Sequence, residues 1–299
     1  MGSALAKHFH NKLYDVVILS RNPKLYDPFA RHIYWDGKNS GEWIEEFENA
    51  FAVINLTGRT VNCRYNEKNK QEILESRVNA TIAVGLAIQQ CKNPPKVWIN
   101  AASATYYRSS FDRDVDEESG ETAEDFSMNV CKAWEKSFWE MKTPSTRKIV
   151  TRTSLGLGNY ENSVLPVLKR LIRFGLGGKM GNGKQFFSWI HEKDYAKSID
   201  FLLQRNDLSG AFNITAPNPL PNKEFMKLMR KEMKMPFGIG ATKWMLEIGA
   251  VVIGTETELV LKSRRVVPKK LLDAGFRFEF PNAKSALYDL IQNGNYVHH

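Results

Sequence analysis

Ser20 and Arg21 stand where an apolar stretch, residues 14–19, gives way to a loop. A hydroxyl can donate a hydrogen bond and a guanidinium carries a fixed charge, so the pair suits a phosphate group. The stretch reads YDVVIL, which is typical of a buried strand, and an amphipathic helix pattern that starts at Gly2 precedes it. A helix opened by a glycine and followed by a strand is typical of the second half of a βαβ nucleotide-binding unit.

A second set of residues could move a proton. Ser103, Tyr106 and Tyr107 follow another apolar stretch, and ligands of open parallel sheets gather where strands end. His191 is a further candidate acid or base because the ordinary pKa of an imidazole lies near neutrality. Each has a structural alternative: the phenols could cover the strand end, and His191 could be hydrogen-bonded beneath a helix that Asp194 caps.

Composition excludes several classes of protein. The chain has 299 residues, of which 42% are hydrophobic, enough to bury a full core. Its apolar runs are shorter than the roughly 20 residues of a spanning helix, no signal peptide is visible, and the three cysteines form no CxxC pair. The net charge of +9 comes from Lys and Arg residues mixed with acids. We therefore expect a cytoplasmic protein that binds no metal, membrane or nucleic acid.

Strand-like and helix-like stretches alternate along the first two thirds of the chain. The predicted strands are residues 14–19, 52–56, 97–101, 148–153 and 211–217, and the predicted helices include 66–89, 126–141, 222–234 and 243–253. Asn222 is a plausible cap of its helix. This alternation predicts an α/β fold with a doubly wound parallel sheet covered by helices on both faces.

The pattern changes after Gly158, where glycines become frequent. We expect a nucleotide-binding domain over residues 1–240, with an interleaved substrate segment at 156–187. A smaller, mostly helical domain is expected over residues 241–295, so that the substrate lobe is built from both parts.

Eight motifs occur in one order along the chain. They are SRNP (20–23), INLTG (54–58), SRVNAT (76–81), PPKVWINAASATYY (94–107), RTSLGLG (152–158), GLGGKMGNGKQFFSWIHEKD (175–194), SGAFNITAPNP (209–219) and VVPKKLLDAGFRFEFP (266–281). The chain thereby resembles the atypical short-chain dehydrogenase/reductase group known as nucleotide-sugar epimerase-like proteins, which carry a C-terminal domain of unknown function. The resemblance implies a Rossmann-like fold and a small-molecule substrate of the nucleotide-sugar kind.

The resemblance also gives roles to residues near a dinucleotide. An acidic residue at the end of the second family strand would favour NAD, whereas Ser20 and Arg21 favour NADP(H) through its 2′-phosphate. The other cofactor-binding residues implied are Gly2 at the helix start, Leu56, Thr57 and Gly58 after the next strand, Glu72 and Arg77 on the helix that follows, and Leu155 at the nicotinamide end.

Two departures from the family pattern bear on function. No room precedes Gly2 for the family's first strand and glycine loop, so we expect an N-terminally truncated chain that binds the cofactor weakly or not at all. The family's Tyr-x-x-x-Lys is also missing, because Ser127 and Cys131 stand at those positions. The sequence therefore leaves two functions open: an NADP(H)-dependent oxidoreductase or epimerase that uses Ser103 with Tyr106, Tyr107 or His191, and a non-enzymatic dinucleotide-binding regulatory or scaffold protein.

Overall fold

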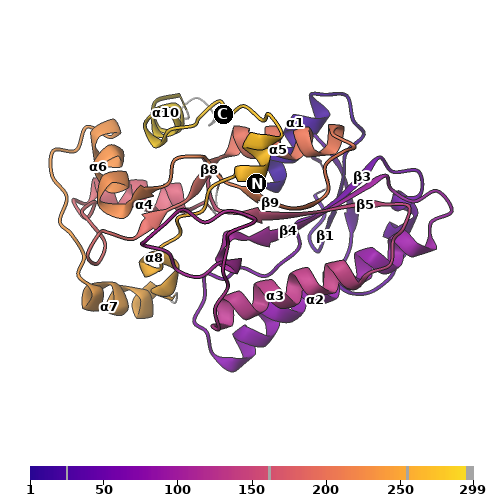
Figure 1. Ribbon diagram of the computed structural model, residues 1–299, viewed down its shortest axis with the longest axis horizontal. Helices are drawn as coiled ribbons and strands as arrows, with labels where there is room; N and C mark the ends of the chain where they lie inside the picture. Colours follow the sequence, from indigo (N-terminus) through magenta and orange to yellow (C-terminus); the bar gives the residue numbers. More distant parts are fainter. Residues whose placement is uncertain (25, 161–162, 254–255, 294–299) are drawn as a thin grey trace.

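The computed structural model describes residues 1–24, 26–160, 163–253 and 256–293. Figure 1 shows a parallel sheet between helices and, beside it, a smaller lobe that contains α4 (Val164–Arg173), α6 (Asn222–Glu232) and α7 (Lys243–Ile253). The α/β class and the Rossmann-like arrangement predicted from the sequence are confirmed. None of the described helices is long and apolar enough to cross a membrane.

Four parallel strands form the main sheet, in the order β3 (Ala52–Asn55), β4 (Val97–Ser103), β5 (Arg147–Thr153) and β9 (Gly210–Ile214). A separate parallel pair contains β1 (Val17–Ser20) and β2 (Arg31–Tyr34). The sequence RHIY of β2 has too few apolar residues to be recognised as a strand, so β2 was not predicted.

Helices cover both faces of the main sheet. Figure 1 shows α2 (Glu67–Gln90) and α3 (Phe126–Glu140) side by side under one face, while α1 (Gly2–His10) and α5 (Glu192–Gln204) lie over the other. Successive residues of β4 point to opposite faces: Trp98 packs with Phe138 of α3, and Ile99 packs with residues of α1 and α5. The sheet is therefore buried on both sides, as a parallel sheet requires.

The smaller lobe combines the middle and the end of the chain. Its strands are β6 (Leu155–Leu157), which pairs with β8 (Trp189–His191), and β7 (Phe186–Phe187), which pairs with β10 (Leu220–Pro221). Two short helical turns, η1 (Glu42–Phe47) and η2 (Ala104–Tyr106), pack around the main sheet. The other remaining elements of the chain are α8 (Glu258–Leu261), α9 (Lys269–Asp273), α10 (Ala283–Tyr288) and η3 (Asp289–Asn293).

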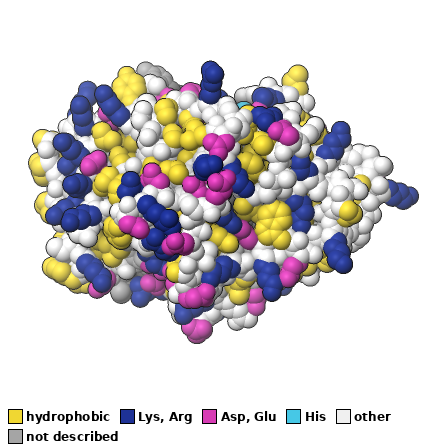
Figure 2. All heavy atoms as spheres, in the orientation of Figure 1, with side chains coloured by type: hydrophobic (Ala, Val, Ile, Leu, Met, Phe, Trp, Pro, Cys, Tyr) yellow, Lys and Arg dark blue, Asp and Glu magenta, His cyan; other side chains and the backbone are white. Residues whose placement is uncertain are grey.

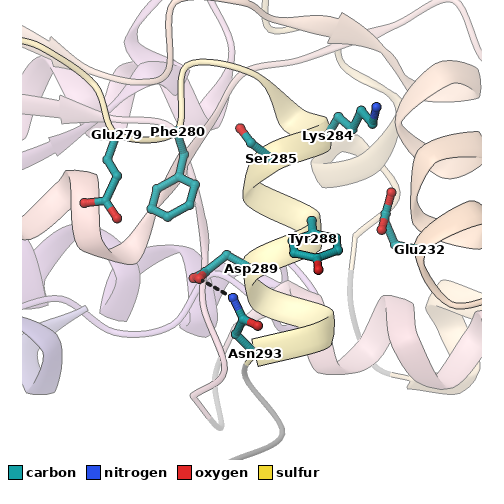
Figure 3. Close-up of a pocket in the computed structure, with 8 residues that line it drawn as sticks. All are labelled: Glu232, Glu279, Phe280, Lys284, Ser285, Tyr288, Asp289 and Asn293. Atoms are coloured by element: carbon teal, nitrogen blue, oxygen red, sulfur yellow. Dashed lines mark hydrogen bonds between the residues drawn. The ribbon is translucent and has the colours of Figure 1, made fainter.

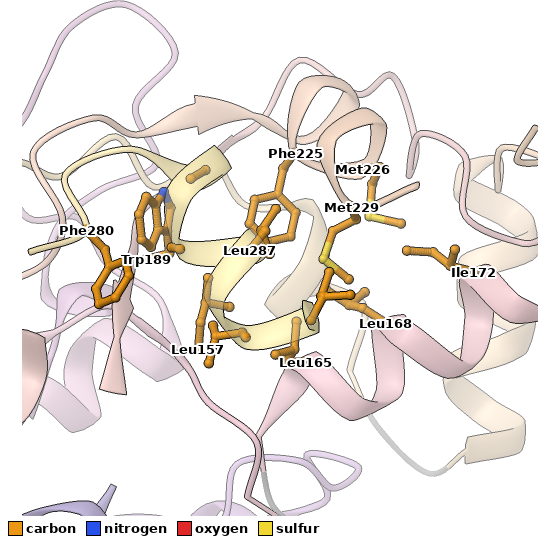
Figure 4. Packing of buried hydrophobic residues seen from close by; sticks show 14 of the residues in the cluster. Leu157, Leu165, Leu168, Ile172, Trp189, Phe225, Met226, Met229, Phe280 and Leu287 are labelled. Atoms are coloured by element: carbon orange, nitrogen blue, oxygen red, sulfur yellow. The ribbon is translucent and has the colours of Figure 1, made fainter. Parts of the chain in front are cut away.

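One hydrophobic cluster holds this lobe together (Figure 4). Leu165 and Ile172 of α4 pack in it with Phe225 of α6 and with Leu287 of α10, and all four are buried. Side chains from residues 157–180 thus share a core with residues 225–291. The domain boundaries at 240 and 241 stay predictions.

Two predicted helix caps are wrong. Pro221 is the N-cap of α6, and Asn222 is instead the first helical residue, where its Oδ1 accepts a hydrogen bond from the Met180 backbone N–H at 2.8 Å. The N-cap of α5 is His191, whereas the buried Asp194 accepts hydrogen bonds from backbone groups at Glu279 and Phe280. Both side chains satisfy distant backbone groups that the local sequence does not reveal.

Candidate active site at the carboxyl edge of the strands

Most of the predicted site residues lie at one edge of the molecule. Ser20 ends β1, Leu56 and Gly58 follow β3, and Ser103 ends β4. Leu155 begins β6 directly after β5 and is half-buried against the core of the smaller lobe. The strands of the main sheet are parallel, so Leu56, Gly58 and Ser103 lie at its carboxyl edge, where ligands of such sheets bind.

The polar side chains at the end of β1 have no partner among the residues that the structure describes. Oγ of Ser20 is buried and forms no hydrogen bond with any of these residues. Arg21 is exposed, and no ion pair of this guanidinium is found within the described residues. Buried polar groups are nearly always hydrogen-bonded in folded proteins, so the hydroxyl of Ser20 retains the capacity for one more hydrogen bond.

The turn after β3 is positioned by two buried amides that sequence reasoning missed. Oδ1 of Asn55 accepts a hydrogen bond from the Thr57 backbone N–H at 3.0 Å, and its Nδ2 donates to Oδ1 of Asn100 at 2.7 Å. Leu56 in the same turn lies beside the start of α1, since a Cβ added at Gly2 would lie 3.7 Å from its Cδ1. An Asn at the end of a predicted strand was the only signal for this network.

Gly58 provides room for a guanidinium. A Cβ at Gly58 would lie 3.2 Å from Cζ of Arg77, which donates a hydrogen bond from Nη1 to the Ile73 carbonyl at 2.9 Å and lies 5.1 Å from the ring centroid of Trp134. Burial lowers the pKa of Arg77.

The other charged residue predicted on α2 does not pair with Arg77. Glu72 forms an ion pair with Arg59, whose Nη2 also donates to Asn69 at 2.9 Å. The structure thus gives the two residues different contacts: Arg77 lies against Gly58, and Glu72 binds Arg59.

Ser103 and Tyr106 lie together after β4. Oγ of Ser103 accepts a hydrogen bond from the Thr105 backbone N–H at 3.1 Å and lies 3.0 Å from Oγ1 of the same residue. Tyr106 is half-buried, with its ring centroid 3.7 Å from Cζ of Arg152. No hydrogen bond of the Tyr106 hydroxyl is found within the described residues, so this phenol is free to bond a ligand.

Tyr107 belongs to a buried network instead. It is fully buried, accepts a hydrogen bond from Nη1 of Arg152 at 2.8 Å and donates one to Oδ1 of Asn213 at 2.9 Å. Arg152 also forms two hydrogen bonds with the carboxylate of Glu135, at 2.8 and 2.7 Å. Burial raises the pKa of Tyr107 to about 12, so this phenol holds its proton tightly.

The family's two catalytic positions carry groups that cannot act as an acid–base pair. Ser127 lies in the first turn of α3 and hydrogen-bonds the carboxylate of Glu258. Cys131 is buried one turn later, and its burial raises the pKa of the thiol to about 12. A protonated thiol cannot replace the ammonium that a lysine would supply.

His191 performs a structural task. It is fully buried, its Nδ1 accepts a hydrogen bond from the Lys193 backbone N–H at 3.0 Å, and its Nε2 lies 3.2 Å from Oδ2 of Asp289. Its ring is stacked on Phe280 at 3.9 Å between centroids. Burial lowers its pKa to about 4, so the imidazole is neutral at physiological pH.

An open cavity of about 520 Å³ lies on the smaller lobe (Figure 3). It is lined by Glu232, Glu279, Phe280, Lys284, Ser285, Tyr288, Asp289 and Asn293, and none of the predicted site residues is among them. Within the described chain no three His, Cys, Asp or Glu side chains are grouped closely enough to hold a metal ion.

Comparison with known proteins agrees with this fold. The family described as NAD dependent epimerase/dehydratase matches residues 1–215, and a domain of unknown function (DUF1731) matches residues 241–290. The epimerase family protein YfhF of Bacillus subtilis is 32% identical over 279 residues, which cover 93% of this chain and 90% of that protein. The epimerase family protein SDR39U1 of Mus musculus is 29% identical over 97% of this chain and 96% of its own length.

A solved structure shares both fold and sequence. The crystal structure of the human epimerase family protein SDR39U1 (isoform 2) with NADPH has a TM-score of 0.86 and 29% identity, and the match covers 98% of this chain and 96% of that chain. The family match over most of the sequence and this likeness agree with the motifs and with the strand order. The chain belongs to the NAD dependent epimerase/dehydratase family.

Proposed function

We propose, against the sequence-based expectation of weak or absent cofactor binding, that the chain binds NADPH at the carboxyl edge of β1 and β3. It would use this cofactor in oxidoreduction or epimerisation of a small organic substrate. The observation that carries the proposal is the buried, unpartnered hydroxyl of Ser20 beside the unpaired guanidinium of Arg21. The human SDR39U1 structure contains NADPH, which supports this choice of cofactor.

The residues present fit a 2′-phosphorylated nucleotide. Arg21 supplies a charge, and Ser20 supplies a donor whose own hydrogen bond is missing in the protein alone. No acidic residue follows β1 within residues 20–24, so nothing there repels a phosphate. Gly58 and the turn held by Asn55 bring backbone close to the same edge.

Bound NADPH would supply a hydride to a carbonyl carbon of the substrate. Tyr106 is the proton donor that the geometry supports best, because its hydroxyl is free and it lies three residues after Ser103 at the end of β4. The Arg152 guanidinium against its ring would stabilise a phenolate, in the manner that lysine serves in typical relatives. Ser103 would orient the substrate oxygen.

Tyr107 and His191 are left out of this proposed machinery. The hydroxyl of Tyr107 already has two partners, and both ring nitrogens of His191 face protein groups. Among substrates, nucleotide-sugars are the first class to test, on the strength of the family resemblance.

The cofactor proposal is tested with nucleotide fragments that differ by one phosphate. Calorimetric titration should show that adenosine 2′,5′-bisphosphate binds at least about tenfold more tightly than adenosine 5′-monophosphate, as expected for charge-assisted hydrogen bonds of roughly 1.5–3 kcal/mol. Arg21→Ala should erase most of this difference, and Arg59→Ala, which removes a paired guanidinium, should not. Equal binding of both fragments to the unaltered chain would refute the assignment.

The catalytic proposal is tested by turnover. NADPH oxidation is followed with a panel of nucleotide-sugars and simple carbonyl compounds, and the first active substrate is then used with Tyr106→Phe and Tyr107→Phe. Removing a general acid should lower kcat by about 10²- to 10⁴-fold in Tyr106→Phe. A larger loss in Tyr107→Phe at unchanged stability would contradict the proposal, and tight cofactor binding without turnover of any substrate would favour the scaffold role.

A further inference from the structure

One end of the smaller lobe carries an excess of positive charge. Residues 163–187 and 218–240 contain ten Lys or Arg residues but two acids, Glu224 and Glu232. None of these ten cations forms an ion pair within the described part of the chain, although Arg230 donates a hydrogen bond to the Gly177 carbonyl at 2.5 Å. Burial and, to a smaller extent, the neighbouring Arg173 charge lower the pKa of Lys169 in α4. No carboxylate among the described residues therefore neutralises these cations through an ion pair.

Two loops at the same end hold aromatic side chains in solvent. The Ile239 backbone N–H donates to the Gly175 carbonyl at 2.8 Å, and the Gly178 N–H donates to the Ile239 carbonyl at 3.0 Å. These bonds place Phe174 and Phe237 beside each other's loops, where 75% and 62% of their surfaces are exposed. The paired backbone of the two loops thus holds two phenyl rings in solvent, outside the hydrophobic core.

Helix α7 begins six residues after Phe237 and exposes two more apolar side chains. Trp244 and Ile248, one turn apart, are 62% and 57% exposed, whereas Leu246 faces inward and packs against the core of the lobe. The helix is therefore anchored on one side and presents a tryptophan and an isoleucine on the other.

Cations stand close in sequence to these apolar side chains. Arg173 directly precedes Phe174, and Lys234 stands three residues before Phe237. Lys179 and Lys223 approach each other, since a Cβ added at Gly183 would lie 3.0 and 3.1 Å from their Cβ atoms. Figure 2 shows dark-blue and yellow side chains mixed on the left side of the molecule, where Figure 1 places α6 and α7.

The charge and the exposed aromatic side chains of this surface indicate which kind of partner it can bind. Two copies of the chain meeting here would bring ten unpaired cations against ten others, which opposes self-association. The aromatic side chains stand on loops and on a helix rather than lining a groove for a peptide. Trp and Phe flanked by Lys and Arg match the boundary of a lipid bilayer, where rings enter the headgroup region and cations meet phosphates.

We propose that this surface binds peripherally to membranes that contain anionic lipids. It comprises the apolar residues Phe174, Leu176, Phe237, Ile239, Trp244 and Ile248 and the surrounding Lys and Arg residues. The sequence-based expectation that no membrane is a partner rested on the lack of a spanning stretch, and peripheral binding needs none. Such binding would bring the substrate lobe close to the bilayer.

The test is sedimentation of the full chain with vesicles. Vesicles of phosphatidylcholine and phosphatidylserine should bind the chain at least about tenfold more tightly than vesicles of phosphatidylcholine alone, and added salt should weaken this binding. Phe237→Ser combined with Trp244→Ser should abolish most of the binding, and so should Arg173→Gln combined with Lys234→Gln. Phe111→Ser is the matched control, because Phe111 is 52% exposed and lies outside this surface.

Three results would overturn the proposal. Equal binding to both kinds of vesicle would show that the cations play no part, and unchanged binding of the two double variants would place the contact elsewhere. Polyglutamate binding that matches vesicle binding and survives loss of Phe237 and Trp244 would show a site for acidic proteins instead. Thermal unfolding of each variant confirms that these exposed substitutions leave the fold intact.

Discussion

The edge after β1 and the start of α3 differ in how their polar groups are satisfied. At α3, Lys262 donates hydrogen bonds to both Asp125 and Glu258 at 2.7 Å, and Glu258 also binds Ser127. At the end of β1, neither the Ser20 hydroxyl nor the exposed Arg21 guanidinium has a partner among the described residues. Polar groups that bind one another stabilise the fold, whereas groups left without partners are available to a ligand.

This comparison bears on the two positions of α3 that carry the catalytic tyrosine and lysine in typical relatives. Ser127 and Cys131 belong to the satisfied region, and the nearby pair Arg152 and Glu135 is buried with its hydrogen bonds complete. The polar groups without a partner among the described residues are Ser20 and Arg21 at the end of β1 and the Tyr106 hydroxyl after β4. In this chain the polar groups at the start of α3 therefore stabilise the fold, whereas the polar groups at the strand ends are available to a ligand.

The largest effect should come from breaking the buried ion pair. Glu135→Gln leaves the Arg152 charge buried without its carboxylate, so we expect a loss of about 3–5 kcal/mol in the free energy of unfolding. Urea denaturation followed by circular dichroism measures it. The control is Asp207→Asn, which breaks the exposed Arg205–Asp207 pair of 2.6 Å and should lower the free energy of unfolding far less. Similar losses in both variants would mean that the buried region is not held by its charges.

A second effect should appear as a pH dependence of stability. The pKa of His191 falls to about 4 in the folded chain, below its ordinary value of 6.5, so the unfolded chain binds the proton more readily between these values. The fold should lose about 3 kcal/mol as the pH falls from 6.5 to 4. His191→Gln should remove most of that dependence. A variant with the same acid profile as the unaltered chain would show that His191 is protonated in the fold.

A smaller effect is expected from the half-exposed charges at α3. Lys262→Met removes the cation shared by Asp125 and Glu258, and we expect a loss of about 1 kcal/mol in the free energy of unfolding. Binding of adenosine 2′,5′-bisphosphate should stay unchanged, because the polar side chains at α3 bind one another and not the nucleotide. Weaker nucleotide binding at unchanged stability would contradict this prediction, because it would show that Lys262 takes part in nucleotide binding.

The smallest effect on stability should follow from Arg21→Ala. An exposed cation without a protein partner contributes nothing measurable to the fold, so the free energy of unfolding should change by less than about 0.5 kcal/mol. The same variant should lose its preference for the 2′-phosphate. A clear loss of stability, measured by thermal unfolding, would indicate that Arg21 is a structural residue.

Much of the fold was predictable because it depends on local patterns. The apolar runs at β3, β4, β5 and β9 were recognised within a few residues, and the capping residues Asn66 of α2 and Asp125 of α3 act on backbone groups three positions away. The strand β2 was missed because RHIY lacks an apolar pattern. Its pairing with β1 comes from its place in the fold rather than from its residue types.

The candidate site was predictable only in its position. Strand ends mark the edge where Ser20, Leu56 and Ser103 gather, but residue type alone could not separate Tyr106 from Tyr107. Tyr107 is occupied because Asn213, which is 106 positions away, accepts its hydrogen bond. The assignment of catalytic and cofactor-binding roles stays a prediction until nucleotides and substrates are tested.

The sequence by itself determined the alternation of strands and helices, the parallel sheet and the polar character of its carboxyl edge, because these follow from periodicity and from the direction of the chain. Only the tertiary structure decided which polar groups are free. Glu258 reaches Ser127 across 131 positions, and His191 meets Asp289 on a distant helical turn, while Arg21 meets no acid within the described residues. A side chain acquires or lacks a partner through the packing of distant segments, and that packing lies beyond any local pattern.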